Sequence, residues 1–422
     1  MKKTFLNLIL TFTIIVILGF SLIVVGFATS NDTAHDIVFS NADQFSNHAI
    51  HNTIRNYSTT KLDVYTDSKI LCEVSYYNKS MSLLDNSMIV YTIGMHNFTK
   101  YIDDDENTLR EYPRYWHGYL AIYKPLFTFL DYNGIRVLEL FFEMAMIACI
   151  VKLMFENNLK SYVIPFLLSM FLIHPEVIGM CLQFAPVFNI TLISIFIMIK
   201  FKDKLFERRR LLCYFLAIGM ITNYFDLLTY PLITFGIPAI FYLLLNEKTT
   251  VKKNVVSLLI FACIWSVGFA GMWLSKWIIS SLILHQNIVL DGFNRFLWRS
   301  STSNFTRIDA VVRNVFIYGK RAYLVIFAAI AIYYVKKIIP NRKNVTTDKL
   351  KNIIPFILLA ITPFLWYFIA SNHSYIHFWF TYRLLFILFF AVMCGIEYVL
   401  KKDDSTTSHI NIKKIPDKHN NM

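Results

Sequence analysis

The residues best suited to chemistry stand in the stretch Tyr112–Tyr119, which reads Tyr-Pro-Arg-Tyr-Trp-His-Gly-Tyr. The guanidinium of Arg114 suits a phosphate group because it donates paired, charge-assisted hydrogen bonds. Tyr115, Trp116 and His117 add flat apolar faces with polar edges, which suit a sugar ring or a lipid headgroup. A second interpretation needs no chemistry, since aromatic belts with an arginine reaching to water are common at membrane surfaces.

The composition of the chain places these residues in a membrane protein. Of 422 residues, 56% are hydrophobic and only 16% are charged, whereas a soluble domain carries about 25% charged residues. The net charge of +13 does not indicate a nucleic-acid partner, because the basic residues stand in short loops between apolar runs. The six cysteines form no CxxC pair, so we expect neither disulfides nor a thiolate metal site.

We expect an all-α, polytopic membrane fold with about ten transmembrane helices, judged by apolar length. The expected spans are Phe5–Ala28, Ile135–Phe155, Tyr162–Ile173, Phe184–Ile199, Leu211–Asn223, Leu228–Leu245, Val255–Leu284, Tyr323–Val335, Ile353–Ala370 and Leu384–Leu400. The first is longer than a signal-peptide core, so we expect it to stay uncleaved. Residues 1–400 then form one membrane-embedded domain, in which residues 29–118 are the first external loop. Residues 401–422 form a polar, disordered cytoplasmic tail.

The distribution of basic residues predicts which loops face the cytoplasm and which face outward. The basic segments Lys200–Arg210, Lys248–Lys253, Lys336–Lys351 and the tail from Lys401 all fall on one side if the spans alternate. The positive-inside rule makes that side cytoplasmic, so both termini are predicted to be cytoplasmic in a multi-pass protein of the plasma membrane. The polar residues that are not simple anchors then gather on the outer face. The external loop is also expected to hold interfacial helices, and the run Tyr119–Leu130 that follows it has the character of one.

Three charged residues enter the second span on one helical face. Arg136, Glu139 and Glu143 are spaced by three and four residues, which aligns their side chains. Arg136 and Glu139 suit an ion pair near the water boundary. Glu143 lies deeper, and a carboxylate inside a span is a functional candidate by default.

In its architecture the chain resembles the GT-C superfamily of polytopic membrane glycosyltransferases. The shared features are one N-terminal span, a long first external loop with carboxylates, interfacial helices, and paired spans with short cytoplasmic turns. The resemblance implies an enzyme that transfers a hexosyl or pentosyl group from a polyprenyl-phosphate-linked donor. The acceptor would be a bacterial cell-surface glycan or a lipid-linked molecule at the outer face. Its partners would be donor, acceptor and membrane lipids.

Such a transfer needs a base for the acceptor hydroxyl, and in this superfamily an acidic residue of the first external loop usually supplies it. Among the loop carboxylates we select Asp85 first, followed by Glu73 and Asp43. Asp85 also suits the cap of a helix that begins near Ser87. For the leaving phosphate we select Arg114, His117 and Arg383, because cations stabilise the charge that develops there. Arg383 equally suits a membrane anchor.

Further substrate-binding candidates lie in two later loops. Asp226 precedes Thr229 and Pro231, a pattern that also suits a plain turn. His373 and His377 stand one helical turn apart, a spacing found in metal sites. No third ligand is evident, so the pattern favours neutral, hydrogen-bonding histidines and indicates no metal or other cofactor; a divalent cation is compatible with it but not indicated.

Three other functional classes stay open at this point. A polysaccharide polymerase or ligase would join lipid-linked oligosaccharides with similar residues. A transporter or flippase of lipid-linked sugars would need polar groups along a path through the membrane. An inert assembly partner would need no cavity. The catalytic interpretation requires Tyr112–Tyr119 and Asn372–Arg383 to open on a shared hollow.

Overall fold

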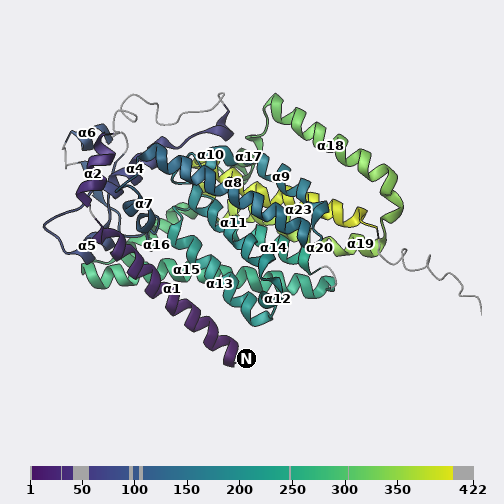
Figure 1. The fold of residues 1–422 in the computed structure, drawn as a ribbon, viewed down its shortest axis with the longest axis horizontal. Helices are drawn as coiled ribbons and strands as arrows, with labels where there is room; N and C mark the ends of the chain where they lie inside the picture. Colours follow the sequence, from purple (N-terminus) through teal and green to yellow (C-terminus); the bar gives the residue numbers. More distant parts are fainter. Residues whose placement is uncertain are drawn as a thin grey trace, which may run out of the picture.

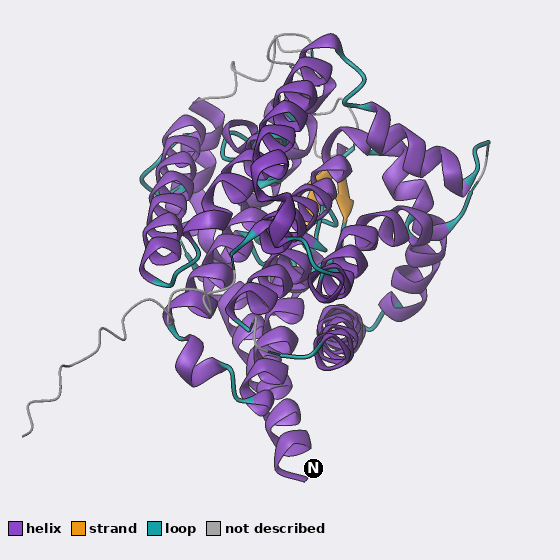
Figure 2. Cartoon of the chain, turned by 90° about the vertical axis from the view of Figure 1, so that its right-hand side faces the viewer, coloured by secondary structure: helices purple, strands orange, loops and turns teal. Residues whose placement is uncertain are grey.

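The structure is a computed structural model that describes residues 2–29, 31–40, 57–94, 98–103, 108–246, 249–302 and 304–402. Helices account for nearly all of the ordered elements (Figure 2). In the described part the exception is a small antiparallel sheet, in which β1 (Tyr91–Ile93) pairs with β2 (Leu109–Glu111). The expected all-α class is confirmed.

Among the described residues, five helical segments are long and apolar enough to cross a membrane: Lys2–Ala28, Val251–Leu284, Arg321–Asn344, Thr347–Ile369 and Phe378–Leu400. Four of them have at most 33% of their most apolar stretch buried within the protein, whereas Phe378–Leu400 has 72% buried. Outward apolar side chains are stable in lipid and costly in water, so the chain is a membrane protein. Other expected spans coincide with helices that are shorter or carry more charge.

The helices of the membrane bundle come from all parts of the chain. They are α1 (Lys2–Ala28), α8 (Tyr132–Glu156), α9 (Val163–Phe171), α11 (Ala185–Lys200), α12 (Lys202–Leu205), α13 (Arg208–Phe225), α14 (Ile233–Leu245), α15 (Val251–Leu284), α18 (Arg321–Asn341), α19 (Thr347–Asn352), α20 (Ile354–Ile369) and α23 (Leu385–Leu400).

Short helices gather at one end of this bundle. They are α2 (Asn31–Ser40), α4 (Val64–Ser75), α5 (Leu83–Ile89), α6 (Phe98–Ile102), α7 (Leu120–Leu126), α10 (Pro175–Ile178), α16 (Ile288–Ser300), α17 (Arg307–Phe316), α21 (Ser371–Ile376) and α22 (Phe378–Thr381). Figure 1 shows α2, α4 and α16 at this end and α19 at the other. The segment 403–422, expected to be a disordered tail, lies outside the described residues.

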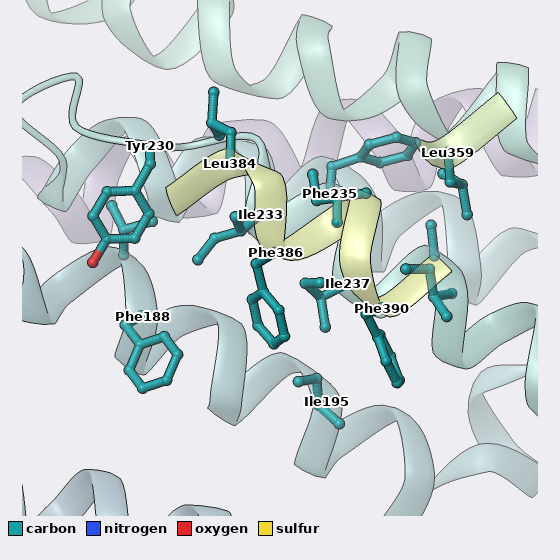
Figure 3. Packing of buried hydrophobic residues seen from close by; sticks show 14 of the residues in the cluster. Phe188, Ile195, Tyr230, Ile233, Phe235, Ile237, Leu359, Leu384, Phe386 and Phe390 are labelled. Atoms are coloured by element: carbon teal, nitrogen blue, oxygen red, sulfur yellow. The ribbon is translucent and has the colours of Figure 1, made fainter. Parts of the chain in front are cut away.

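The core of the bundle is built from aromatic and β-branched side chains. Phe386 and Phe390 point from α23 into the space between Ile237 of α14 and Ile195 of α11 (Figure 3). All four are fully buried. Burying side chains of this size contributes about 1.5–3 kcal/mol each relative to exposure in water, which fixes how the central helices pack.

Two glycines let α13 and α15 cross at close range. A Cβ atom on Gly219 would lie 2.2 Å from the carbonyl oxygen of Trp265, and one on Gly268 would lie 2.4 Å from that of Leu216. Small residues at such crossings allow backbones to approach in membrane bundles. The pair therefore sets the position of α15, whose far end leads into α16.

The charges at the start of α8 are arranged differently from the expected ion pair. Arg136 donates to the side chain of Asn133 at 3.3 Å, and its guanidinium lies over the Tyr132 ring. Glu139 instead accepts from Tyr123 at 3.2 Å and from the side chain of Asn189 at 2.6 Å. The prediction of an Arg136–Glu139 pair was wrong, because Glu139 faces neutral donors on neighbouring helices.

Candidate functional site

A cavity of about 460 Å³ lies where α4, α16, α21 and α22 meet. Its lining combines two carboxylates, three cations, two histidines and several aromatic rings, from Asp63, Tyr65, Thr66, Lys69, Glu73, Tyr112, Gln183, Leu227, Arg295, Trp298, Arg299, His373, Ile376, His377, Trp379 and Phe380. We call it the polar cavity. Residue 112 and residues 373–380 both line it, so the two stretches singled out in the sequence meet there.

Helix α4 presents one acidic and basic face to this cavity. Thr66, Lys69 and Glu73 are spaced by three and four residues, so they share one side of the helix. Asp63 caps the helix: its carboxylate accepts from the backbone N–H and the hydroxyl of Thr66, both at 3.1 Å. Burial raises the pKa of Asp63, and Lys61 and Lys69 partly oppose that rise.

Among the carboxylates on the cavity lining, Glu73 is the one held by side chains of the stretch Tyr112–Tyr119. It is 2% exposed, and its Oε2 accepts a hydrogen bond of 2.5 Å from the hydroxyl of Tyr119. The Tyr119 hydroxyl lies 2.7 Å from Nδ1 of His117, which in turn lies 3.3 Å from the same carboxylate oxygen. The other ring nitrogen of His117 donates to the carbonyl oxygen of Tyr112 at 3.0 Å. A carboxylate, a phenol and an imidazole therefore form one buried hydrogen-bonded unit beside the cavity.

The basic part of the lining comes mainly from α16. Arg295, Trp298 and Arg299 are spaced by three and four residues and face the cavity together. The Arg295 guanidinium lies 4.0 Å from the centre of the Trp298 ring, and burial lowers its pKa, as do the charges of Arg299 and Arg114. Within the described residues, Nε of Arg295 and Nε of Arg299 have no hydrogen-bond partner. Arginine side chains on a cavity lining suit an anionic ligand, because a guanidinium donates charge-assisted hydrogen bonds.

His373 is held as a neutral hydrogen-bonding group. Its Nδ1 accepts from the guanidinium of Arg299, so Nε2 carries the proton and donates to the carbonyl oxygen of Leu228. Burial lowers its pKa well below 6.5, and the charges of Arg299 and His377 act in the same direction. Both nitrogens are engaged, so His373 cannot serve as a metal ligand in this arrangement. The part of the chain that the structure describes contains no cluster of three or more metal-ligating side chains.

Most of the stretch Tyr112–Tyr119 stabilises the fold. Trp116 is 1% exposed and donates from its indole N–H to the carbonyl oxygen of Met272 at 2.7 Å. Arg114 pairs with Asp291 at 2.9 Å. Trp116 therefore lies neither in an exposed aromatic belt nor on the lining of the polar cavity, because α15 covers it.

Tyr115 and the backbone of Arg114 complete the same packing. The carbonyl oxygen of Arg114 accepts from both Trp273 and Trp277 at 2.9 Å. Tyr115 is 4% exposed and packs against Tyr112 and Trp273. These contacts attach the stretch to α15 and leave Tyr112 as its contribution to the cavity wall.

Asp226 and Arg383 are buried but do not line the polar cavity. One carboxylate oxygen of Asp226 accepts from the N–H and the hydroxyl of Thr229, both at 2.7 Å, which is the turn that the sequence pattern allowed. Arg383 is fully buried and donates from Nε to the carbonyl oxygen of Ile173 at 3.1 Å. Its guanidinium lies 4.5 Å from the centre of the Phe184 ring. Arg383 is therefore neither at the lipid boundary nor on the cavity lining.

The structure places the other two predicted carboxylates apart from this cavity. Asp85 stands at the start of α5, where its carboxylate accepts from the hydroxyl of Ser82 at 2.7 Å. That helix begins at Leu83 with Ser82 as its cap, so the expected start near Ser87 was wrong. Asp43 lies outside the described residues.

Sequence reasoning did not single out Asp63, Lys69, Arg295 or Arg299. All four stand in loops predicted to be external. They line the same cavity because of helices that the composition of those loops does not reveal. The i, i+4 spacing of Arg295 and Arg299 around Trp298 was the available signal.

Comparison with known proteins identifies no relative: no protein-family model, curated protein or solved structure matches the chain.

Proposed function

We propose that the protein is a glycosyltransferase that uses a sugar linked to a polyprenyl phosphate. The observation that carries the proposal is the polar cavity, whose lining combines the carboxylates Glu73 and Asp63, the cations Arg295 and Arg299, and several aromatic rings. A single displacement at a sugar's anomeric carbon needs these groups: a base on one side and cations on the other.

Glu73 is the proposed base. As the acceptor oxygen bonds to the anomeric carbon, its hydroxyl proton passes to the Glu73 carboxylate, and the bond from that carbon to the phosphate oxygen breaks. The configuration at the anomeric carbon inverts. Tyr119 holds Oε2 of Glu73 in place, and His117 lies beside both groups. Asp63 is a weaker candidate because its two oxygens already cap α4.

Arg295 and Arg299 are the proposed phosphate ligands. The leaving lipid phosphate carries increasing negative charge as the bond breaks, and guanidinium donors at that point stabilise the transition state. Trp298 supports this role by stacking under Arg295. Lys69 adds a third positive charge to the cavity lining.

The aromatic rings supply the proposed sugar platform. Tyr65, Tyr112, Trp298 and Trp379 line the cavity, and flat rings with polar edges suit the apolar face of a pyranose. Lys61 lies 4.0 Å from the centre of the Trp379 ring, which holds a further cation next to this wall.

The proposal includes a topology of about ten spans with the cavity at the outer face of the plasma membrane and both termini in the cytoplasm. Five spanning helices and the gathering of short helices at one end support it. The same cavity would serve a ligase or polymerase that joins lipid-linked oligosaccharides.

The deciding experiment uses the purified protein in liposomes with a synthetic polyprenyl-phosphate sugar that carries a radioactive sugar. We expect the sugar to pass to added glycan acceptor, with release of polyprenyl phosphate at a matching rate. Movement of intact donor between leaflets without loss of sugar would overturn the proposal in favour of a flippase. Mass analysis of surface polysaccharide from cells with and without the protein identifies the sugar.

A further inference from the structure

A second polar hollow lies at the opposite end of the bundle from the polar cavity. It has a volume of about 620 Å³ and lies between the start of α13, the end of α14 and the start of α15. Helix α13 links the two ends: it begins with Arg208 at this hollow, and its 18 residues rise about 27 Å toward Leu227 at the polar cavity. The hollow is thus a separate place in the fold, and a ligand bound there is independent of the proposed function.

One side of the hollow is basic. Arg208, Lys252 and Lys253 line it, and none forms an ion pair within the described residues. The nearest carboxylate on the same helix, Glu207, pairs at 3.2 Å with Arg209 and at 3.2 Å with Arg210. The cations come from two helices that are distant in sequence, so folding assembles them around one space.

Two helix N-termini add to the positive field. Helices α13 and α15 both begin at the hollow, and neither has a side-chain hydrogen bond from its cap residue. The first N–H groups of a helix carry a partial positive charge and bind anions. Thr249 and Ser257 place hydroxyl groups on the same lining, which suits the oxygens of a phosphate group.

The other side of the hollow is apolar and continues onto the lipid-facing surface. Leu211, Leu212, Val256 and Ile260 line it. Val256 is 46% exposed, and Leu259 on the same helix is 59% exposed. A ligand with a charged head and a long hydrocarbon chain would bury both of its parts, whereas a free anion would leave the apolar wall uncovered.

We propose that this hollow binds one anionic phospholipid. Its phosphate lies among Arg208, Lys252 and Lys253, and its acyl chain runs along the apolar side chains of α13 and α15. Basic pockets between transmembrane helices bind anionic lipid headgroups in this way, with about 1 kcal/mol contributed by each basic residue. The occupant would bridge the two helices that also cross through Gly219 and Gly268.

The test uses the full-length protein in detergent micelles doped with phosphatidylglycerol and phosphatidylcholine, with retained lipid counted by native mass spectrometry. We expect wild type to retain one phosphatidylglycerol in preference to phosphatidylcholine. The variant Arg208→Gln/Lys252→Gln/Lys253→Gln should weaken this retention ~10-fold or more. Its three positions are exposed, so folding is preserved, and a sharp size-exclusion peak checks this.

The matched control removes three charges elsewhere, with Lys336→Gln/Arg342→Gln/Lys343→Gln. These residues line neither the hollow nor the polar cavity, so retention should equal that of wild type. Equal losses in the two variants, or no loss in the first, would overturn the site. If millimolar inorganic phosphate displaced the lipid as effectively as added phosphatidylglycerol, the site would be one for free phosphate and the lipid assignment would be wrong.

Discussion

Oε2 of Glu73 lies 3.3 Å from Nδ1 of His117, and the hydroxyl of Tyr119 contacts both. Glu73 reaches this position from α4, whereas the other two residues come from the stretch before α7. The contact joins the first-loop helix to the aromatic stretch and orients the carboxylate at the cavity. Its buried setting strengthens each hydrogen bond and excludes water that would otherwise solvate the carboxylate.

The first prediction concerns the base. Glu73→Gln keeps the size of the side chain and removes its ability to take a proton, so sugar transfer should fall by ~100-fold or more. Asp85→Asn is the matched control: its carboxylate lies at the start of α5, and activity should stay near wild type. Initial rates with the labelled donor measure both. Full activity of Glu73→Gln, together with loss of activity in Asp85→Asn, would show that Asp85 is the base instead of Glu73.

The second prediction tests whether the Tyr119 hydroxyl positions Glu73 or whether Tyr119 acts only by packing of its ring. Tyr119→Phe retains the ring but removes the hydroxyl between Glu73 and His117, so kcat should fall by ~10-fold while KM for the donor stays constant. A change in KM alone, with kcat unmoved, would show that Tyr119 acts only by packing.

The third prediction assigns the phosphate ligand. Arg295→Gln removes a charge-assisted donor from the cavity and should raise the donor KM by ~10-fold. Arg114→Gln is the comparison, because Arg114 is paired with Asp291 and lies off the cavity lining. It should affect the stability of α16 more than donor binding. If Arg114→Gln raised the donor KM more than Arg295→Gln did, Arg114 would be the phosphate ligand.

The fourth prediction concerns pH and His373. Because the folded-state pKa of His373 lies well below 6.5, the unfolded chain binds more protons than the folded chain as pH falls through that value. Stability should therefore decrease on acidification from pH 7 to pH 5. His373→Gln keeps an acceptor and a donor but cannot titrate, so its Tm should change less over this range. Thermal unfolding in detergent, followed by intrinsic fluorescence, measures the difference; equal slopes would contradict it.

The fifth prediction tests the α13–α15 crossing. Gly219→Ala places a methyl group 2.2 Å from a backbone carbonyl oxygen, so the helices must separate at a cost of roughly 1–3 kcal/mol. Gly395→Ala in α23 is the control, since its nearest neighbour would lie at an ordinary 3.8 Å. The denaturation midpoint of purified Gly219→Ala should lie below that of wild type, whereas the midpoint of Gly395→Ala should stay near it.

The sequence alone determined the class of this protein. Apolar length and low charge indicate a helical membrane protein, because hydrocarbon excludes unpaired backbone groups and leaves helices as the solution. The sequence also identified Glu73 as a carboxylate of the first external loop, His117 as a group for the leaving phosphate, and His373 by its one-turn spacing to His377.

Only the tertiary structure decided which of these residues meet. Glu73 and Arg295 are far apart in the chain, and nothing in their local pattern records that α4 and α16 face one another. The roles of Trp116 and Arg383 likewise depended on burial by α15 and by the core, where their polar atoms bond to backbone carbonyl oxygens. Local spacing orients a side chain on its own helix, but packing between helices determines what that side chain contacts.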